Sequence, residues 1–133
     1  MAFVHGKTAY FKVNSTDLSA FTNNVAPKRS ADAHDTTTFG KTAHTYAGGL
    51  KDGAITATGV YDDGATGPQA ILEPLLGATV TYEYRPEGTG TGKPAKTGGA
   101  VLTAYEETTP VADMITWSCT LQLSDTVTIA DQA

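Results

Sequence analysis

The sequence predicts a mainly β protein, an antiparallel β-sandwich or half-barrel with one short accessory helix. Three observations lead to this prediction. Several segments alternate polar and apolar residues with a period of two, which is the pattern of strands with one buried face. Clusters of Gly, Asn, Asp and Pro separate these segments, as turns do. Only one segment carries apolar residues at helical spacing, so the helical part is small.

The N-terminal third of the chain predicts short strands and turns. Residues 7–13 alternate between apolar and polar side chains, which indicates a first strand. A short element is expected over residues 17–21, and residues 25–32 can be extended. Pro27 lacks an amide hydrogen, so the extended segment is expected at a sheet edge or at the start of a strand.

Two long segments are predicted to be irregular. Residues 32–50 are rich in Thr, Ala, Gly and His but also carry Phe39, Tyr46 and Leu50. A loop of this length is uncommon in a compact domain unless it has a function, so we expect these side chains to dock on the protein's own core or on a neighbour. Residues 86–99 are rich in Gly, Thr and Lys, which predicts a flexible loop with no apolar anchor.

The middle of the chain predicts a strand, a helix and a second strand. Residues 54–61 alternate, and residues 80–85 form a further strand. The helix is expected over residues 67–77, with Pro68 suited to its first turn. Pro74 lies inside it and is expected to shorten or distort it.

The C-terminal third predicts a long antiparallel hairpin with strands at 101–107 and 115–124. The second of these strands alternates most clearly, and its polar positions are neutral. The tail at 129–133 is expected to be short and mobile. The apolar positions of the strands and the helix predict the core residues Ile55, Leu72, Leu75, Ile115, Trp117, Cys119 and Leu121.

Length and composition limit the class of protein. The chain has 133 residues, the size of one domain spanning 1–133, and a net charge of −5. Lys28-Arg29 is the only adjacent basic pair, which argues against electrostatic binding of nucleic acid. The one cysteine excludes an internal disulfide. No apolar run approaches the roughly 18 residues of a membrane helix, so we expect a soluble protein made in a cytoplasm.

No motif predicts catalysis, a cofactor or a metal site. Asp32, His34, Asp35 and His44 suggest a metal site, but a solvated polar loop is the favoured interpretation because no further ligand completes the set. The Gly-rich run at 88–93 resembles a phosphate loop but lacks the Gly-Lys-Ser/Thr ending and a following helix. The acidic pairs Asp62-Asp63 and Glu106-Glu107 are neighbours, which on a strand point to opposite faces. We therefore expect no enzyme activity.

The order of several segments resembles the major tail proteins, or tail tube proteins, of long non-contractile-tailed bacteriophages. The resemblance covers most of the chain and depends on order and spacing together. Its segments, in chain order, are Asp17-Leu18-Ser19-Ala20-Phe21, Arg29-Ser30-Ala31-Asp32, Thr36-Thr37-Thr38-Phe39-Gly40, Tyr46-Ala47-Gly48-Gly49-Leu50-Lys51-Asp52-Gly53, Gly59-Val60-Tyr61-Asp62, and Gly99-Ala100-Val101-Leu102-Thr103-Ala104-Tyr105 leading through Pro110-Val111 to the last strand.

This resemblance implies a virion protein that forms hexameric rings stacked into a tube through which the viral DNA leaves without specific binding. It implies assembly in the host bacterial cytoplasm, tape-measure and tail-terminator or tip proteins as partners, and no membrane. The polar strand positions are then expected to face the lumen: Thr56, Thr58, Thr103, Tyr105, Glu107, Ser118, Thr120 and Gln122. Contacts between subunits or rings are expected from Phe39, Thr42, Tyr46 and Leu50.

Two other interpretations remain open. The tube subunit of a contractile injection or secretion system shares the fold that the resemblance implies. A monomeric β-sandwich binding module is the alternative from a different class, with Tyr82, Tyr84 and Tyr105 as candidate contact residues. Tubes or six-fold rings of purified protein would favour the first class, and a monodisperse monomer would favour the binding module.

Overall fold

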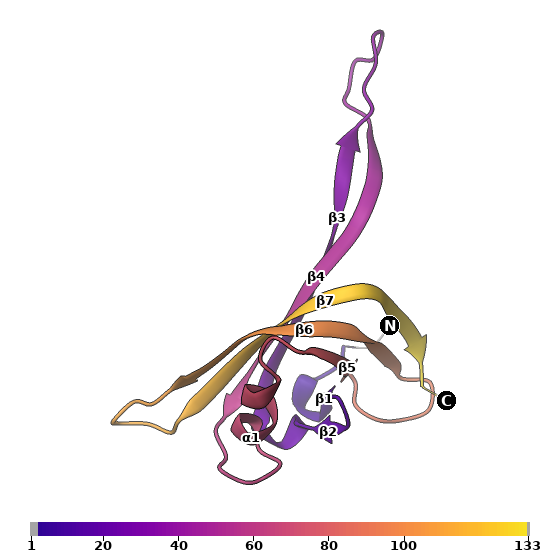
Figure 1. Cartoon of the computed structure of the whole chain (residues 1–133). Helices are drawn as coiled ribbons and strands as arrows, with labels where there is room; N and C mark the ends of the chain where they lie inside the picture. Colours follow the sequence, from indigo (N-terminus) through magenta and orange to yellow (C-terminus); the bar gives the residue numbers. More distant parts are fainter. Residues whose placement is uncertain (1–2, 133) are drawn as a thin grey trace.

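The architecture is one open antiparallel sheet with a short helix packed on one face (Figure 1). The computed structural model describes residues 3–132. Its seven strands pair in the order β2-β1-β5-β6-β7-β4-β3. In chain order the elements are η1 (Gly6–Thr8), β1 (Tyr10–Val13), β2 (Thr16–Asp17), η2 (Ser19–Phe21), β3 (Thr22–Asp35), β4 (Tyr46–Val60), α1 (Pro68–Leu72), η3 (Glu73–Leu75), β5 (Thr79–Arg85), β6 (Pro94–Thr108) and β7 (Thr116–Asp131). The predicted mainly β fold with one short helix is confirmed, and its strands form one open sheet.

The core lies on the face of the sheet that α1 covers. The register places Ile55 opposite Leu121 and Ala57 opposite Cys119, so the apolar positions of β4 and β7 share this face. Of the predicted core residues, Leu75 is half-buried against the core, and the fully buried ones are Ile55, Leu72, Trp117, Cys119 and Leu121. Ile115 is only half-buried and lies outside the core cluster, because it precedes β7 where the hairpin leaves the core. That core assignment was wrong.

The helix is short for the reason expected from the sequence. α1 ends at Leu72, and the chain continues as the tighter η3 around Pro74. Proline has no amide hydrogen to donate to the preceding turn, so regular α-helical bonding cannot continue through it. Gly77 follows at a φ of 82°, a conformation that favours glycine, and its amide donates to the Leu102 carbonyl at 2.7 Å.

Strands extend into both of the predicted long loops and shorten them. β3 continues to Asp35 and β4 begins at Tyr46, so the segment predicted as irregular over 32–50 contains a connection of residues 36–45 only. β6 begins at Pro94, which shortens the second loop to residues 86–93. β7 continues to Asp131, into the predicted mobile tail, whose last residue, 133, lies outside the described residues. The outer parts of β3 and β4 are exposed on both faces, so they show no alternation of polar and apolar residues.

Candidate functional site: two projecting hairpins and a polar sheet face

The β3–β4 hairpin projects far beyond the rest of the molecule, as Figure 1 shows at the top. We call residues 29–52 the arm. Its strands pair continuously, apart from an irregularity between Ala31 and Ala33. Almost every arm residue is exposed on both faces. An isolated two-stranded hairpin is marginally stable in water, so the arm is a structure suited to packing against another surface.

Local hydrogen bonds order the tip of the arm. The Thr36 amide donates to the Thr45 carbonyl at 2.8 Å, and the Thr45 amide donates to the Thr37 hydroxyl at 2.9 Å. The Asp35 carboxylate accepts the Thr37 amide at 2.8 Å, and hydrogen bonding from Thr37 lowers the pKa of Asp35. Residues 36–45 are irregular, as the sequence predicts for this part, and these hydrogen bonds hold the two ends of the connection together.

The arm displays the apolar side chains that the sequence singled out. Phe39 stands at the turn and is fully exposed, while Tyr46 is 62% and Leu50 is 82% exposed. Thr42 is also exposed. The structure places these four residues on one projecting element, with none of them on the protein's own core. Side chains of this kind in water favour a contact with another surface.

The face of the sheet opposite the core is polar and largely neutral where β4 and β7 meet. Thr56 lies opposite Thr120, Thr58 opposite Ser118, and Ala54 opposite Gln122. Directly opposed residues of an antiparallel pair point to the same side. The Gln122 amide donates to the Asp52 carboxylate and to the Gly53 carbonyl, each at 2.8 Å, and fixes this surface beside the arm.

A bulge in β6 changes which residues reach this polar face. The register moves by one residue between Leu102 and Ala104, so Thr103 is the extra residue. Its hydroxyl donates to the Thr120 carbonyl at 3.2 Å. Beyond the bulge, Tyr105 lies opposite Cys119 and Glu107 opposite Trp117.

The expectation that Tyr105 and Glu107 share the polar face is therefore wrong. Tyr105 packs against the core, and its hydroxyl donates to the Glu107 carboxylate at 2.7 Å. Burial raises the pKa of Tyr105, and the hydrogen bond to Glu107 raises it further. Ala104, opposite Thr120, and Glu106, opposite Ser118, take their places on the polar face.

The far end of the β6–β7 hairpin is a second projection, extending to the left in Figure 1. We call residues 106–115 the hairpin tip. It exposes Val111 fully and Met114 by 66%. Glu106, Glu107 and Asp113 are exposed around them. This tip joins apolar and acidic side chains on one element. Apart from Glu107, expected in the lumen, and Ile115, expected in the core, the sequence predicted only a turn here.

Gln132 holds the Gly-rich loop of residues 86–93 in place. Its side chain accepts from the Gly90 amide at 3.1 Å and donates to the Gly88 carbonyl at 2.8 Å. Its backbone accepts from the Gly92 amide at 2.8 Å and donates to the Lys93 carbonyl at 2.9 Å. The sequence predicts a flexible loop without an apolar anchor, and in the structure these four hydrogen bonds to Gln132 tie the loop to the end of β7. These hydrogen bonds join residues about 40 positions apart, so no local sequence pattern predicts them.

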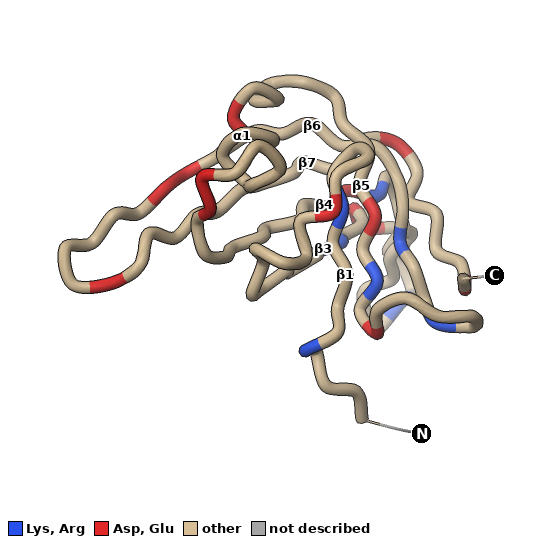
Figure 2. The backbone as a smooth tube through the Cα atoms, turned by 90° about the horizontal axis from the view of Figure 1, so that it is seen from below, with Lys and Arg blue, Asp and Glu red and all other residues tan. Residues whose placement is uncertain are grey.

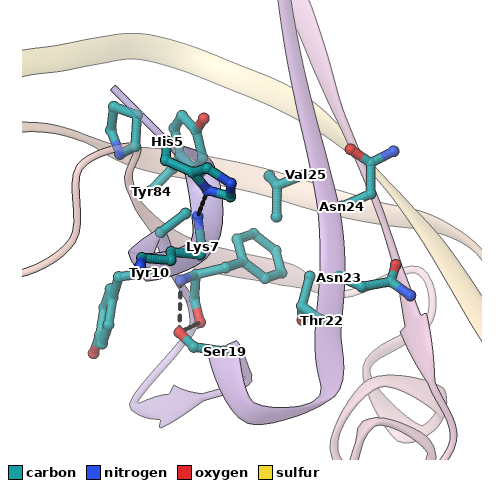
Figure 3. Close-up of a pocket in the computed structure, with 13 residues that line it drawn as sticks. His5, Lys7, Tyr10, Ser19, Thr22, Asn23, Asn24, Val25 and Tyr84 are labelled. Atoms are coloured by element: carbon teal, nitrogen blue, oxygen red, sulfur yellow. Dashed lines mark hydrogen bonds between the residues drawn. The ribbon is translucent and has the colours of Figure 1, made fainter. Parts of the chain in front are cut away.

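A hollow of about 400 Å³ lies between the N-terminal segment and the start of β3 (Figure 3). His5, Ser19 and Tyr84 are among its lining residues. The His5 Nδ1 accepts the Lys7 amide at 3.1 Å, and the Ser19 hydroxyl accepts the Phe11 amide at 2.9 Å. Within the described residues no Asp, Glu or Cys lines the hollow, so it does not combine a nucleophile with a carboxylate.

The candidate metal residues of the arm do not converge. His44 lies 3.7 Å from the Asp35 carboxylate, while His34 lies against Gly49. In the described part of the chain, no group of three or more His, Cys, Asp or Glu side chains could hold a metal ion. Among residues 3–132 no helix has the length and apolar character to span a membrane.

Several solved structures have this architecture. No protein-family model and no curated protein sequence matches the chain. A chain of the virion of a native gene transfer agent particle matches with a TM-score of 0.80 and 13% identity, over 96% of this chain and 99% of that one. A chain of the tail of an empty gene transfer agent particle, determined with C6 symmetry, matches with a TM-score of 0.76 and 14% identity over the same shares.

The SPP1 tail tube protein is similar with a TM-score of 0.79 and 13% identity, over 98% of this chain and 80% of that one. A chain of the anti-feeding prophage baseplate is less similar, with a TM-score of 0.60, 9% identity and coverage of 92% and 91%. This chain therefore has the fold of the SPP1 tail tube protein and of the matched chains in the gene transfer agent particles.

Proposed function

We propose that this protein is the structural subunit of a viral tail tube, in which hexameric rings stack to form the conduit for DNA. The observation that carries the proposal is the likeness of nearly the whole chain to the SPP1 tail tube protein, at a TM-score of 0.79. The C6 symmetry of the empty gene transfer agent tail supports six copies in a ring. The protein would then be a virion component that assembles in the host cytoplasm, with tape-measure and terminator or tip proteins as further partners.

The polar sheet face is the proposed wall of the channel. Thr56, Thr58, Ser118, Thr120 and Gln122 share this face, and Thr103 lies at its bulge. The opposite face is occupied by the subunit's own core, so only the polar face remains for a lumen. Hydroxyls and amides offer no fixed positive charge to DNA phosphates, and a protein with a net charge of −5 repels them. Such a wall lets DNA pass without specific binding.

The arm is the proposed connector between subunits or rings. It carries Phe39, Thr42, Tyr46 and Leu50 away from the core, and its apolar side chains are exposed in the single chain. Packing them on a neighbouring subunit would remove apolar surface from water and stabilise a hairpin that has little support of its own.

Electron microscopy of the purified, concentrated protein tests the function directly, because tubes or six-fold rings are expected. The double variant Phe39→Ser/Tyr46→Ser should remain a folded monomer that forms no tubes. Leu76→Ser is the matched control, since Leu76 is 54% exposed but lies on the connection behind η3. A wild-type protein that stays monomeric at every concentration would favour a binding module. Normal tubes from the double variant would show that the arm is not the connector.

The tube of a contractile injection system is a second candidate in the same structural class. The match to the anti-feeding prophage baseplate chain supports it, but the TM-score of 0.60 is lower than the 0.79 of the SPP1 tail tube match. We therefore place the non-contractile tail tube first.

A further inference from the structure

The hairpin tip combines exposed apolar side chains with charge of one sign. Figure 2 shows the β6–β7 hairpin and the surroundings of α1 with acidic residues and no basic ones. The charged residues of the tip are all acids: Glu106, Glu107 and Asp113. Neither of the two ion pairs that the described residues form involves the tip. Its negative charge therefore lies beside the exposed Val111 and Met114 without a cation to balance it.

These properties define the surface that the hairpin tip fits. A second tip is a poor partner, because the contact would bring like charges together. The tip also projects away from the rest of its own chain (Figure 1). The complementary surface is therefore free of acids, carries a cation beside apolar side chains, and is hollow enough to receive a turn.

The hollow between the N-terminal segment and the start of β3 has these properties (Figure 3). Its volume of about 400 Å³ lies within the roughly 300–1,000 Å³ of pockets that receive drug-sized molecules, so one or two side chains fit. His5 and Lys7 line it, and among the described residues no Asp or Glu does. Phe11, Val25 and Tyr84 add apolar and aromatic surface to the same lining.

The cationic side of this hollow is free to meet a carboxylate. Lys7 is exposed and has no ion pair within residues 3–132. His5 accepts the Lys7 amide at Nδ1, so its neutral ring carries the proton on Nε2, where it can be donated. Of the acids that neighbour lining residues in the sequence, Glu83 forms an ion pair with Arg85 at 2.6 Å, and Glu87 is half-buried outside the lining.

The hairpin tip and the hollow lie at opposite ends of the molecule. β7 begins beside the tip at Thr116 and ends at Asp131. Near that far end Ile129 pairs with Lys96, which pairs in turn with Tyr84 of the hollow. Figure 1 shows the same separation, with the tip at the left and β1 and β5 toward the right. A contact between the two surfaces therefore joins two copies of the chain.

We infer that the hairpin tip of one copy docks in this hollow on a second copy. Val111 and Met114 would pack on its apolar lining, where a thioether beside the Tyr84 ring is favourable, and Asp113 would meet Lys7. The contact joins two different surfaces, and a heterologous contact of this kind adds copies in one direction. The inference rests on the proposed function and assigns residues to one contact within the tube.

Charge exchange tests the pairing of the two surfaces. Asp113→Lys and Lys7→Glu should each raise the critical concentration for tube formation at least about tenfold, because like charges then face each other. The variant with both changes should return toward the wild-type value, because the pair is restored with reversed sign. The matched controls Asp63→Lys and Lys28→Glu make the same changes of charge at exposed residues outside the tip and the hollow, and they should assemble like the wild type.

Cysteine cross-linking tests the same contact by position. Met114→Cys protein mixed with Asn24→Cys protein should form a disulfide-linked heterodimer on oxidation, because Met114 is exposed on the tip and Asn24 is exposed at the hollow. The natural Cys119 is buried and should not react. Leu76→Cys, at a residue that is 54% exposed, replaces Met114→Cys in the control mixture and should give little heterodimer. Circular dichroism should show that all variants are folded.

The outcomes separate this inference from the proposed function. Wild-type tubes together with normal assembly of Asp113→Lys and Lys7→Glu would overturn the docking contact and leave the tube function standing. Cross-linking of the Asn24→Cys protein to itself would indicate a symmetric contact, and the absence of any cross-link would indicate that another partner fills the hollow; either result would overturn the inference. A wild-type protein that never forms tubes, but whose tip and hollow cross-link, would overturn the proposed function and leave the contact.

Discussion

Gly59→Ala is expected to destabilise the protein strongly, although it adds a single methyl group. Gly59 lies in β4 opposite Thr22 on one side and Trp117 on the other. An added Cβ would overlap the Phe21 carbonyl oxygen and would lie 2.8 Å from both the Phe21 carbonyl carbon and the Thr22 Cα. These are backbone atoms, so the clash cannot be relieved by turning a side chain.

The free-energy cost has two parts. Overpacking of this kind costs about 1–3 kcal/mol. The same Phe21 carbonyl accepts the Trp117 indole N–H at 3.2 Å, and displacing it weakens a hydrogen bond worth about 1 kcal/mol. The free energy of unfolding should therefore fall by about 2–4 kcal/mol. For a chain of 133 residues this corresponds to a drop in melting temperature of about 7–14 °C.

The chain offers a matched control and an internal probe. Gly48→Ala makes the same change in the same strand, and nothing lies within 4 Å of the added atom, so the free energy of unfolding should change by less than about 0.5 kcal/mol. Urea unfolding followed by the fluorescence of Trp117, the one tryptophan, measures both variants. If Gly59→Ala were as stable as Gly48→Ala, the close approach of η2 to β4 would be wrong.

Three further changes test other parts of the structure. Tyr82→Phe should leave the free energy of unfolding unchanged or raise it by up to about 1 kcal/mol, because the Tyr82 hydroxyl is buried without a hydrogen-bond partner in the described chain. A clear decrease of the free energy of unfolding, measured in urea, would show that the hydroxyl has a partner. Burial raises the pKa of the Cys119 thiol to about 12, so little thiolate exists at pH 8 and maleimide should label the native protein far more slowly than the unfolded one. Equal labelling rates would contradict that burial. Gln132→Ala should speed hydrogen exchange of the Gly90 amide, which is bonded to the removed side chain, more than that of the Gly92 amide, which is bonded to the retained backbone. Equal acceleration of both amides would indicate general fraying of the loop.

Alternation in the sequence predicted the parts of the fold that bury one face. Ile55 and Leu121 are buried where the period of two placed them, and Thr56 and Thr120 lie on the opposite face. The arm escaped prediction because a hairpin exposed on both faces needs no alternation. The bulge at Thr103 escaped because one inserted residue reverses the face of every position after it without changing the local composition.

The sequence predicted which residues belong to the candidate site better than it predicted how they are arranged. The composition of residues 32–50 pointed to Phe39, Tyr46 and Leu50 as contact residues, and they are exposed on the arm. It did not show that Tyr46 and Leu50 lie on a paired strand, with Phe39 in the connection between the two strands of the arm. The role of Gln132 depends on contacts between distant parts of the chain, which no single segment of the sequence records.

The outer edge of β3 has a consequence for newly made subunits. β3 is the last strand of the sheet and runs for 14 residues from Thr22 to Asp35 with one paired neighbour, so its other side presents unpaired backbone groups. A long free edge is a template on which another chain can pair and aggregate before ordered assembly begins. Pro27 offers no amide hydrogen there, and Lys28 and Arg29 add like charges that repel a second copy aligned alongside. Pro27, Lys28 and Arg29 therefore make this edge a poor template for pairing with a second copy.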